Sequence, residues 1–349
     1  SYRPGGFEAR HLDESIPLKY GIIGQETQGP GGFFMALRSI YVMQGILADI
    51  EQICPRARVF NYTNPINILS EAVTHHSSIP FLSFCEGPIY FPGIIARAAG
   101  MDASKFDTVM LGLNHGCWSV RHLYDGQDAM PLLREAYERR LREGGIDLYQ
   151  LRLLKLTVMM ESIPADYFQY YYFKDEILAD LQKKPTTRAQ DIQALAPDYW
   201  QHYREQAAAD EPTLDPSHSR GGIHELELAI DAMDAIFNDR KEILPVNIPN
   251  HGLLPDLPDD RVVEVRGYFD RSGVVGLADG QLPPHTRGLV KALAEYQYLT
   301  AEAAWQGRRI DAIRALASNP LVPTLEKAEA LYDEMAAAHK AYLPERLLT

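Results

Sequence analysis

The sequence has few cysteines, a deficit of positive charge and no long hydrophobic segment. Its 349 residues include 3 cysteines, 34 lysines and arginines and 47 aspartates and glutamates, giving a formal net charge of −13. So few cysteines exclude a disulfide framework and favour a reducing compartment. The negative charge argues against a nucleic-acid or anionic-membrane partner. No apolar run reaches the roughly 18 residues that span a bilayer, and no signal peptide is visible, which favours the cytoplasm.

Several common site motifs are also missing. The chain contains no Gly-x-Gly-x-x-Gly turn, Walker loop, Gly-x-Ser-x-Gly elbow or Cys-x-x-Cys pair, and each of these would have indicated a particular chemistry. The length allows one large or two medium domains with an ample buried core. Any function must therefore be inferred from less familiar residue patterns.

Three short apolar runs in the first third of the chain each end in polar residues. They are 59–62, followed by Asn64; 79–84, followed by Cys85 and Glu86; and 109–113, followed by Asn114 and His115. The segments between them have helix length, so the pattern predicts parallel strands joined by crossover helices. Ligands of such sheets bind beyond the carboxyl ends of the strands. We therefore expect the three polar endings to converge on one rim.

The rest of the chain is predicted to be largely helical. Residues 1–32 are rich in glycine and proline and are expected to form a loop, either held close to a partner or lying on the surface. Helical spacing of apolar residues predicts helices at 33–54, 65–75, 88–99, 132–141, 148–161, 177–182, 223–238, 288–306, 310–317 and 325–341. Residues 243–248 are expected to be extended and residues 262–265 to form a strand. The pattern indicates an α/β protein whose second half is a mixed α+β region.

Cys85 and His115 are candidate metal ligands, because each follows a predicted strand. A lone cysteine is more often an ordinary buried thiol, and two ligands are weak evidence for a metal. Ligand softness would favour zinc, whereas manganese becomes plausible if substrate hydroxyls and water complete the coordination.

Tyrosines and arginines supply further candidates. The aromatic run at 167–173 is expected to pack in the core, but a tyrosine such as Tyr167 serves as a base when a nearby cation lowers its pKa. Arg188 follows two threonines and Arg220 precedes two glycines. Both lie in predicted turns that are suited to binding a phosphate or carboxylate. Most arginines of this kind are solvated surface residues. These residues predict an enzyme with an anion and metal pocket.

Taken together, the motifs resemble glycoside hydrolase family 4, the NAD- and divalent-metal-dependent glycosidases. The matching stretches occur in family order over nearly the whole chain: 2–6 (YRPGG), 16–27 (IPLKYGIIGQET), 61–65 (NYTNP), 85–88 (CEGP), 112–115 (GLNH), 167–171 (YFQYY) and 246–250 (VNIPN).

The resemblance implies a redox-assisted elimination. NAD oxidises the C3 hydroxyl of the sugar, which acidifies the hydrogen on C2, and a manganese ion held by Cys85 and His115 stabilises the resulting enediolate. Tyr167 removes the C2 proton, the aglycone leaves from C1, water adds and the hydride returns to C3. The substrate implied is a 6-phosphoglucoside or a related hexoside.

The resemblance also suggests roles for the other candidates. Asn64 is expected to contact the sugar and the cofactor, and Arg188 to lie in the substrate pocket. Arg3 and Arg220 are candidates for a 6-phosphate or another anion, and Asn114 supports His115 and the substrate site. Glu86 stands where the residue type varies with substrate class in the family. Its carboxylate could protonate a leaving group if burial raises its pKa.

The resemblance finally implies an architecture. Residues 1–118 would be the remainder of a Rossmann-like NAD-binding domain, with roughly 70 to 80 residues of its nucleotide-binding half expected before Ser1. Residues 119–349 would form a largely helical α+β domain, similar to that of lactate and malate dehydrogenases, that carries the substrate and metal site and forms homodimers or homotetramers. Two alternatives are a dehydrogenase of the lactate and malate type acting on a 2-hydroxy acid or sugar, and an inactive sugar-binding protein.

Overall fold

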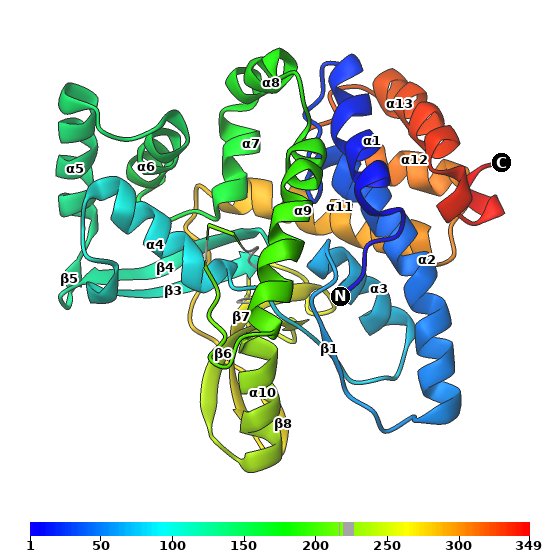
Figure 1. The fold of residues 1–349 in the computed structure, drawn as a ribbon, viewed down its shortest axis with the longest axis horizontal. Coiled ribbons are helices and arrows are strands. Elements are labelled where there is room, and N and C mark those ends of the chain that lie inside the picture. The colour runs from blue at the N-terminus through cyan, green and yellow to red at the C-terminus, as the bar shows by residue number, and fades with distance from the viewer. Residues whose placement is uncertain (216, 219–226) are drawn as a thin grey trace.

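The computed structural model describes residues 1–215, 217–218 and 227–349, so that Arg220 lies outside the described residues. Figure 1 shows a mixed sheet with helices around it. The described helices are α1 (Gly6–Lys19), α2 (Gly29–Ile53), α3 (Ile66–His76), α4 (Gly87–Ala99), α5 (Met130–Glu143), α6 (Leu148–Met160), α7 (Gln169–Tyr172), α8 (Lys174–Lys183), α9 (Arg188–Ala207), α10 (Glu227–Asn238), α11 (Arg287–Trp305), α12 (Arg309–Ala317) and α13 (Leu325–Ala338). The described strands are β1 (Val59–Asn61), β2 (Phe81–Ser83), β3 (Phe106–Leu113), β4 (Gly116–Tyr124), β5 (Gln127–Asp128), β6 (Glu242–Pro249), β7 (Val262–Asp270) and β8 (Gly273–Gly276).

The predicted α/β fold is confirmed, but one part of its reasoning was wrong. The sheet has the order β1-β2-β6-β7-β3-β4-β5, with β8 beside β7. β1 and β2 are parallel, as expected. β3 instead pairs antiparallel with both β4 and β7, because a two-residue turn at Asn114 and His115 returns the chain directly into β4. That hairpin leaves no room for a crossover helix.

The polar endings nevertheless converge. Register places one residue of each inner strand in a row across the sheet: Asn61, Ser83, Asn247, Glu264 and Gly112. β1 and β2 reach this row from one side of the sheet. β3 runs in the opposite direction and reaches it from the other side. The carboxyl ends of all three strands therefore meet at the middle of the sheet rather than along one rim.

Three helices (α1, α7 and α9) and three strands (β4, β5 and β8) were missed in the sequence. α1 occupies 14 residues of the segment 1–32 that was predicted to be a loop, because glycine and proline stand near its ends rather than throughout it. The glycines that follow are held against the chain itself: a Cβ on Gly24 would lie 1.9 Å from the carbonyl oxygen of Glu14. α9 escaped notice because its exposed surface carries little apolar periodicity. β4 and β5 complete the hairpin after His115.

The buried apolar residues form two clusters. One fills the space between the sheet and α4, α6 and α10. The other joins α2 and α3 to α11, α12 and α13, so the two ends of the chain share a core (Figure 1). In the part of the chain that the structure describes, α2 is the one helix long and apolar enough to cross a membrane, and 56% of that segment is buried. Burial of this extent is typical of a core helix.

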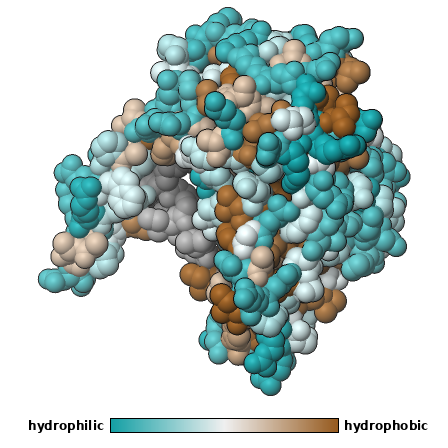
Figure 2. Space-filling model, turned by 90° about the vertical axis from the view of Figure 1, so that its right-hand side faces the viewer, coloured by the Kyte–Doolittle hydropathy of each residue, from teal (hydrophilic) through white to brown (hydrophobic). Residues whose placement is uncertain are grey.

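The second half of α2 is less covered. α2 lies at the right of Figure 1, and Figure 2 turns that side of the molecule toward the viewer, where brown apolar patches interrupt a mainly teal surface. The exposed apolar residues of α2 are Tyr41, Val42, Ile46 and Ile53. Scattered exposure of this kind is common on soluble proteins.

Candidate active site

The structure brings Cys85 and His115 together. Cys85 follows β2 and His115 occupies the turn between β3 and β4, with φ of +56°. Their Sγ and Nε2 atoms are 3.6 Å apart. Burial lowers the pKa of His115 to about 3, so its imidazole is neutral and has a free lone pair at neutral pH. Burial and then the charge of Glu264 raise the pKa of the Cys85 thiol.

The separation of these two atoms fits a shared cation. With the bond lengths of zinc-type sites, about 2.3 Å to sulfur and about 2.0–2.1 Å to nitrogen, one ion places its two donor atoms roughly 3–3.7 Å apart. Among the residues described, no third His, Cys, Asp or Glu joins the pair. Oxygen atoms from substrate and water would therefore fill the other positions, an arrangement that suits manganese.

Several segments that carry or contact this site have a buried oxygen atom with no hydrogen-bond partner among the described residues. These atoms are Asn64 Oδ1, Asp166 Oδ1, Asn247 Oδ1 and Glu264 Oε2. Unpaired buried polar atoms are rare in folded proteins, and a group of them indicates a water molecule, ion or ligand site. All four atoms are hydrogen-bond acceptors, so the region is suited to cations and to donors such as sugar hydroxyls.

Asn114 is held by a buried carboxylate. Its Nδ2 atom donates a 2.9 Å hydrogen bond to Oε1 of Glu264, which also accepts a 3.1 Å bond from Asn247 Nδ2. A hydrogen bond from Asn114 to Cys85 acts to lower the pKa of the thiol. Burial raises the pKa of Glu264 to about 7. Asn114 thus connects Glu264 to both candidate metal ligands.

Tyr167 lies against His115. The two rings are stacked, with centroids 3.9 Å apart and planes 12° apart. The segment before Tyr167 is fixed by backbone hydrogen bonds to β4, from Ala165 N to Cys117 O and from Ser119 N to Ile163 O, each 2.8 Å long. Burial raises the pKa of Tyr167 well above its usual value. A base role for this phenol therefore requires a cation beside it.

Two neighbouring carboxylates have different environments. Glu86 stands at the start of α4 and accepts a 3.0 Å hydrogen bond from the hydroxyl of Tyr62. Asp166 accepts a 2.7 Å bond from the hydroxyl of Tyr149, and burial raises its pKa to about 6. A carboxyl with a raised pKa can donate a proton near neutral pH, whereas an ionised one can only accept.

A cavity of about 1000 Å³ opens beside Tyr167. Its wall comes from α1, α6, α8 and the start of α9, and includes Arg10, Asp166, Tyr167 and Arg188. Arg188 is the first residue of α9, after a capping box formed by Thr187 and Gln190. Arg188 is exposed and has no ion pair within the described ranges. A helix N-terminus with a free guanidinium suits an anion.

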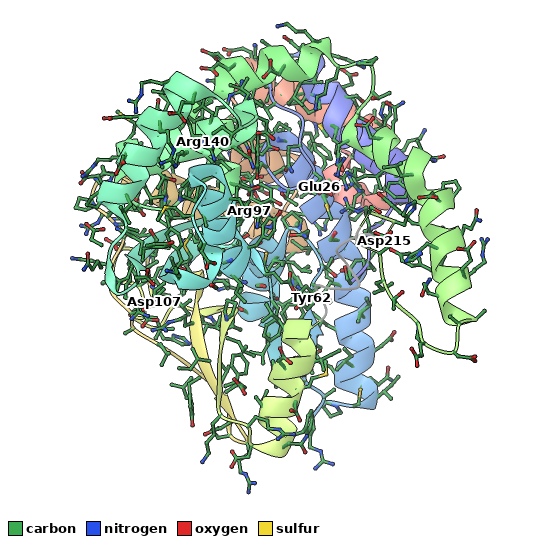
Figure 3. The ribbon with its side chains drawn as sticks, turned by 60° about the vertical axis from the view of Figure 1, so that its left-hand side comes forward. Glu26, Tyr62, Arg97, Asp107, Arg140 and Asp215 are labelled. Carbon is green, nitrogen blue, oxygen red and sulfur yellow. The ribbon has the colours of Figure 1, made fainter. Side chains whose placement is uncertain are left out.

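A network of ion pairs builds the other side of this cavity. Oε2 of Glu26 lies 2.7 Å from Nη2 of Arg3 and 2.8 Å from Nη1 of Arg10. Glu26 lies toward the middle of the molecule in Figure 3, between the helices. Arg10 also binds Glu14 at 2.7 Å, and Glu14 accepts a 2.8 Å bond from the backbone N–H of Ala189 in α9.

Some residues of this site were not found in the sequence. The prediction did not include Arg10, Glu26, Asp166 or Glu264. Arg10 and Glu14 stand at i and i+4 in a segment that was assigned to a loop, so their helical pairing was hidden. Asp166 directly precedes Tyr167, which was a usable signal. Glu264 is far from the other residues in sequence, and only the pairing of β6, β7 and β3 reveals it.

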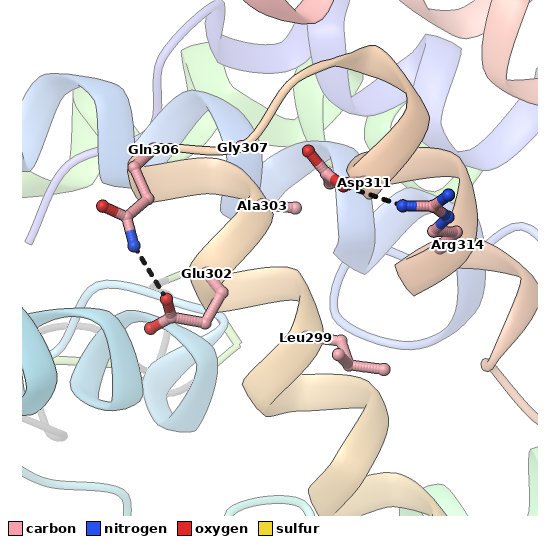
Figure 4. Close-up of a pocket in the computed structure, with 7 residues that line it drawn as sticks. All are labelled: Leu299, Glu302, Ala303, Gln306, Gly307, Asp311 and Arg314. Atoms are coloured by element: carbon pink, nitrogen blue, oxygen red, sulfur yellow. Dashed lines mark hydrogen bonds and ion pairs between the residues drawn. The ribbon is translucent and has the colours of Figure 1, made fainter.

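A second hollow, of about 440 Å³, lies between α11 and α12 (Figure 4). It is lined by Leu299, Glu302, Ala303, Gln306, Gly307, Asp311 and Arg314. Its polar side chains bind one another, with Gln306 donating to Glu302 at 3.1 Å and Arg314 to Asp311 at 3.2 Å. None of the predicted site residues lies here.

Two family models match the chain. The model for the family 4 glycosyl hydrolases matches residues 1–101, and the model for the family 4 glycosyl hydrolase C-terminal domain matches residues 110–322. A protein of Bacillus subtilis (strain 168) named "Probable 6-phospho-beta-glucosidase" is 35% identical over 353 residues, which cover 99% of this chain and 79% of the relative.

Solved structures show the same likeness. A 6-phospho-beta glucosidase from Thermotoga maritima, in a structure with NAD and glucose-6-phosphate, has a TM-score of 0.82 and 27% identity, covering 98% of this chain and 80% of its own. A 6-phospho-alpha-glucosidase from gut microorganisms, in a structure with NAD and Mn²⁺, has a TM-score of 0.83 and 26% identity, covering 99% and 81%. Similar proteins therefore include enzymes named for both anomers.

Proposed function

Because this chain belongs to glycoside hydrolase family 4, we propose that it cleaves the glycosidic bond of a 6-phosphoglucoside or related hexoside. It is an NAD- and divalent-metal-dependent glycosidase, and a similar 6-phospho-alpha-glucosidase has a solved structure with NAD and Mn²⁺. When bound, NAD supplies reversible oxidation of the sugar and the cation supplies Lewis acidity.

Residues of the chain would bind the cation and transfer the protons. Cys85 and His115 would hold the cation, and Tyr167 would remove the proton from the sugar carbon next to the oxidised one. The stacking of Tyr167 on His115 fixes the phenol beside the metal position, where a positive charge lowers its pKa. Glu86 would donate a proton to the leaving group, and its contact with the hydroxyl of Tyr62 would hold the carboxyl in place.

Other residues would bind and orient the sugar. The unpaired Oδ1 of Asn64 would accept from a sugar hydroxyl or contact the cofactor. Arg188 would bind the 6-phosphate or another anion at the start of α9, and Arg3 and Arg220 are further candidates for the same charge. Asn114, held by its hydrogen bond to Glu264, would fix the position of His115 and contribute to substrate binding. NAD binding would fall to residues 1–118 and substrate binding chiefly to residues 119–349.

One observation carries this proposal: the imidazole of His115 lies within contact distance of both the thiol of Cys85 and the phenol ring of Tyr167, which come from two other segments. A dehydrogenase of the lactate and malate type has no use for such a Cys and His pair, so the glycosidase is favoured. We further propose a cytoplasmic homodimer or homotetramer that acts on small sugar substrates, without a nucleic-acid or membrane partner.

A substrate panel tests the proposal. Nitrophenyl α- and β-glucosides, each with and without a 6-phosphate, are assayed with NAD and Mn²⁺ together, singly and after chelation. We expect hydrolysis of a phosphorylated glycoside that requires both additions, and deuterium at C2 that slows turnover or exchanges with solvent. Hydrolysis that survives removal of both would refute the mechanism, and net NADH formation without hydrolysis would favour the dehydrogenase. Sugar binding without turnover would favour the inactive alternative.

A further inference from the structure

Glu264 is a buried carboxylate without a counter-ion. It lies on β7 and is 1% exposed. Its Oε1 atom accepts two amide hydrogen bonds, from Asn114 and Asn247, while its Oε2 atom is buried and has no N–H or O–H donor among the described residues. The thiol of Cys117 is a further group that interacts with this carboxylate. Within the described part of the chain, no lysine, arginine or histidine pairs with it. An uncompensated buried charge of this kind is costly.

Two other buried carboxylates are compensated. Glu71 is equally buried, at 1% exposed, but binds the imidazole of His75 at 3.2 Å and the backbone N–H of Val262 at 2.7 Å. Asp13 is fully buried and pairs with Arg38 at 2.6 Å. Glu264 differs from these two acids, and a bound cation would supply the compensation that side chains supply to them.

The nearest candidate for that cation is the metal position at Cys85 and His115. Asn114 links the two, because its amide bonds to Glu264 and to the sulfur of Cys85 and its backbone continues into His115. The charge of Glu264 also reaches the sulfur, since it is among the causes that raise the pKa of Cys85. A carboxylate and a thiol this close to each other favour a divalent cation bound at the thiol.

We propose that Glu264 is the counter-charge of the divalent cation held by Cys85 and His115, and that it positions Asn114 to donate to the sulfur. The inference rests on the proposed function, because it uses the same metal position. One thiolate leaves a dication with a single positive charge, and the Glu264 carboxylate neutralises it in a region of low dielectric. Glu264 is not a ligand but a positioning residue that acts through Asn114.

Metal affinity measures this role without turnover. Mn²⁺ alone is titrated into the protein, without sugar or NAD, and free Mn²⁺ is followed by its electron paramagnetic resonance signal. We expect Glu264→Gln to weaken Mn²⁺ binding by about tenfold to a hundredfold. We expect Glu264→Asp, which keeps the charge, to retain an affinity between those of Glu264→Gln and the natural protein. The melting temperature without Mn²⁺ should stay level or rise in Glu264→Gln, because an uncompensated charge is removed.

Glu71→Gln is the matched control, since it changes an equally buried carboxylate away from the site and should leave Mn²⁺ affinity within about twofold of the natural value. The inference is overturned if Glu264→Gln binds Mn²⁺ as the natural protein does, or if Glu264→Asp binds as weakly as Glu264→Gln. If the natural protein hydrolyses phosphoglucosides but Glu264→Gln keeps its affinity, only this inference fails. If the Mn²⁺ effect is found without hydrolysis, only the proposed function fails, and a natural protein that binds no Mn²⁺ overturns both.

Discussion

The proposed metal position at Cys85 and His115 differs from the cavity wall formed by α1, α6, α8 and α9, here called the helix wall, in how its polar groups are hydrogen-bonded. Around Cys85 and His115, buried oxygens of Asn64 and Glu264 have no N–H or O–H donor among the described residues. In the part of the wall built by α1, Glu26 binds two arginines and both oxygens of Glu14 are taken. The α1 part of the wall is satisfied without a ligand, whereas the proposed metal position has bonding capacity left for one. Unmet bonding capacity favours a ligand site, and satisfied bonding favours a supporting role.

Replacing either proposed metal ligand should have the largest effect on activity, because it would remove the cation-binding site that sets this region apart from the helix wall. We expect Cys85→Ser or His115→Ala to lower kcat on a nitrophenyl 6-phosphoglucoside roughly a thousandfold or more, because Lewis acidity is worth several kcal/mol. Steady-state kinetics with saturating NAD and Mn²⁺ measure it. Cys54→Ser, at an exposed cysteine, is the control and should keep full activity. A Cys85→Ser enzyme as fast as Cys54→Ser would contradict the assignment.

Tyr167 tests whether the phenol works beside the metal or only packs there. We expect Tyr167→Phe to lower kcat about 10²- to 10⁴-fold, the range for loss of a positioned base, while the ring stack on His115 and Mn²⁺ affinity persist. Tyr172→Phe is the control, because Tyr172 packs on Trp118 and has no expected part in the chemistry. Equal rates for the two variants would show that Tyr167 is a packing residue.

Arg188 tests the wall rather than the metal position. We expect Arg188→Ala to raise KM for the phosphorylated substrate about tenfold to a hundredfold with little change in kcat, since a hydrogen bond to a charged group is worth about 1.5–3 kcal/mol. KM for the unphosphorylated glycoside should not change. Arg121→Ala, which breaks an exposed pair with Asp107 (Figure 3), is the control. A fall in kcat for both substrates would place Arg188 in the chemistry instead.

The smallest effect, a change in stability with pH, is expected at Asp166. This residue lines the cavity and directly precedes Tyr167. Its pKa is raised to about 6 by burial, against about 3.9 in an unfolded chain. As pH rises from about 4 to 6 the unfolded chain loses this proton first, so stability falls over that window. Asp166→Asn should therefore gain about 1 kcal/mol relative to the natural protein by pH 7 and nothing near pH 4, after allowance for partial exposure.

Melting temperatures at pH 4 to 7 check this expectation. Asp175→Asn, at an exposed position on α8, is the control and should follow the pH dependence of the natural protein. An Asp166→Asn curve parallel to that of the natural protein would show that Asp166 ionises freely in the fold.

Motifs in the sequence singled out Cys85, His115 and Tyr167, which the structure brings together, but they did not show how the strands that carry them pair. Local apolar runs and the polar residues after them predicted convergence of Cys85 and His115. The assumption of parallel strands was wrong for β3, because strand direction depends on which distant strand becomes its neighbour. The row through Asn247 and Glu264 arises from pairing over more than a hundred residues, and no local pattern records it.

The helix wall was harder to predict for a different reason. α1 begins and ends among glycines and prolines, and its buried face carries Arg10, Asp13 and Glu14 rather than apolar residues alone. A method that reads helices from apolar spacing cannot recognise a face buried through ion pairs. Arg188, which was predicted to lie in the substrate pocket, lines the cavity, but it starts a helix rather than lying in an isolated turn.

Glu14 ties two helices together with one carboxylate. One oxygen holds Arg10 within α1, and the other caps the first turn of α9 through Ala189, next to Arg188. This carboxylate therefore joins the two helices at the wall of the cavity, which it also lines. Shortening the side chain by one methylene would draw the start of α9 and α1 closer together and change the width of the cavity, without altering Cys85, His115 or Tyr167.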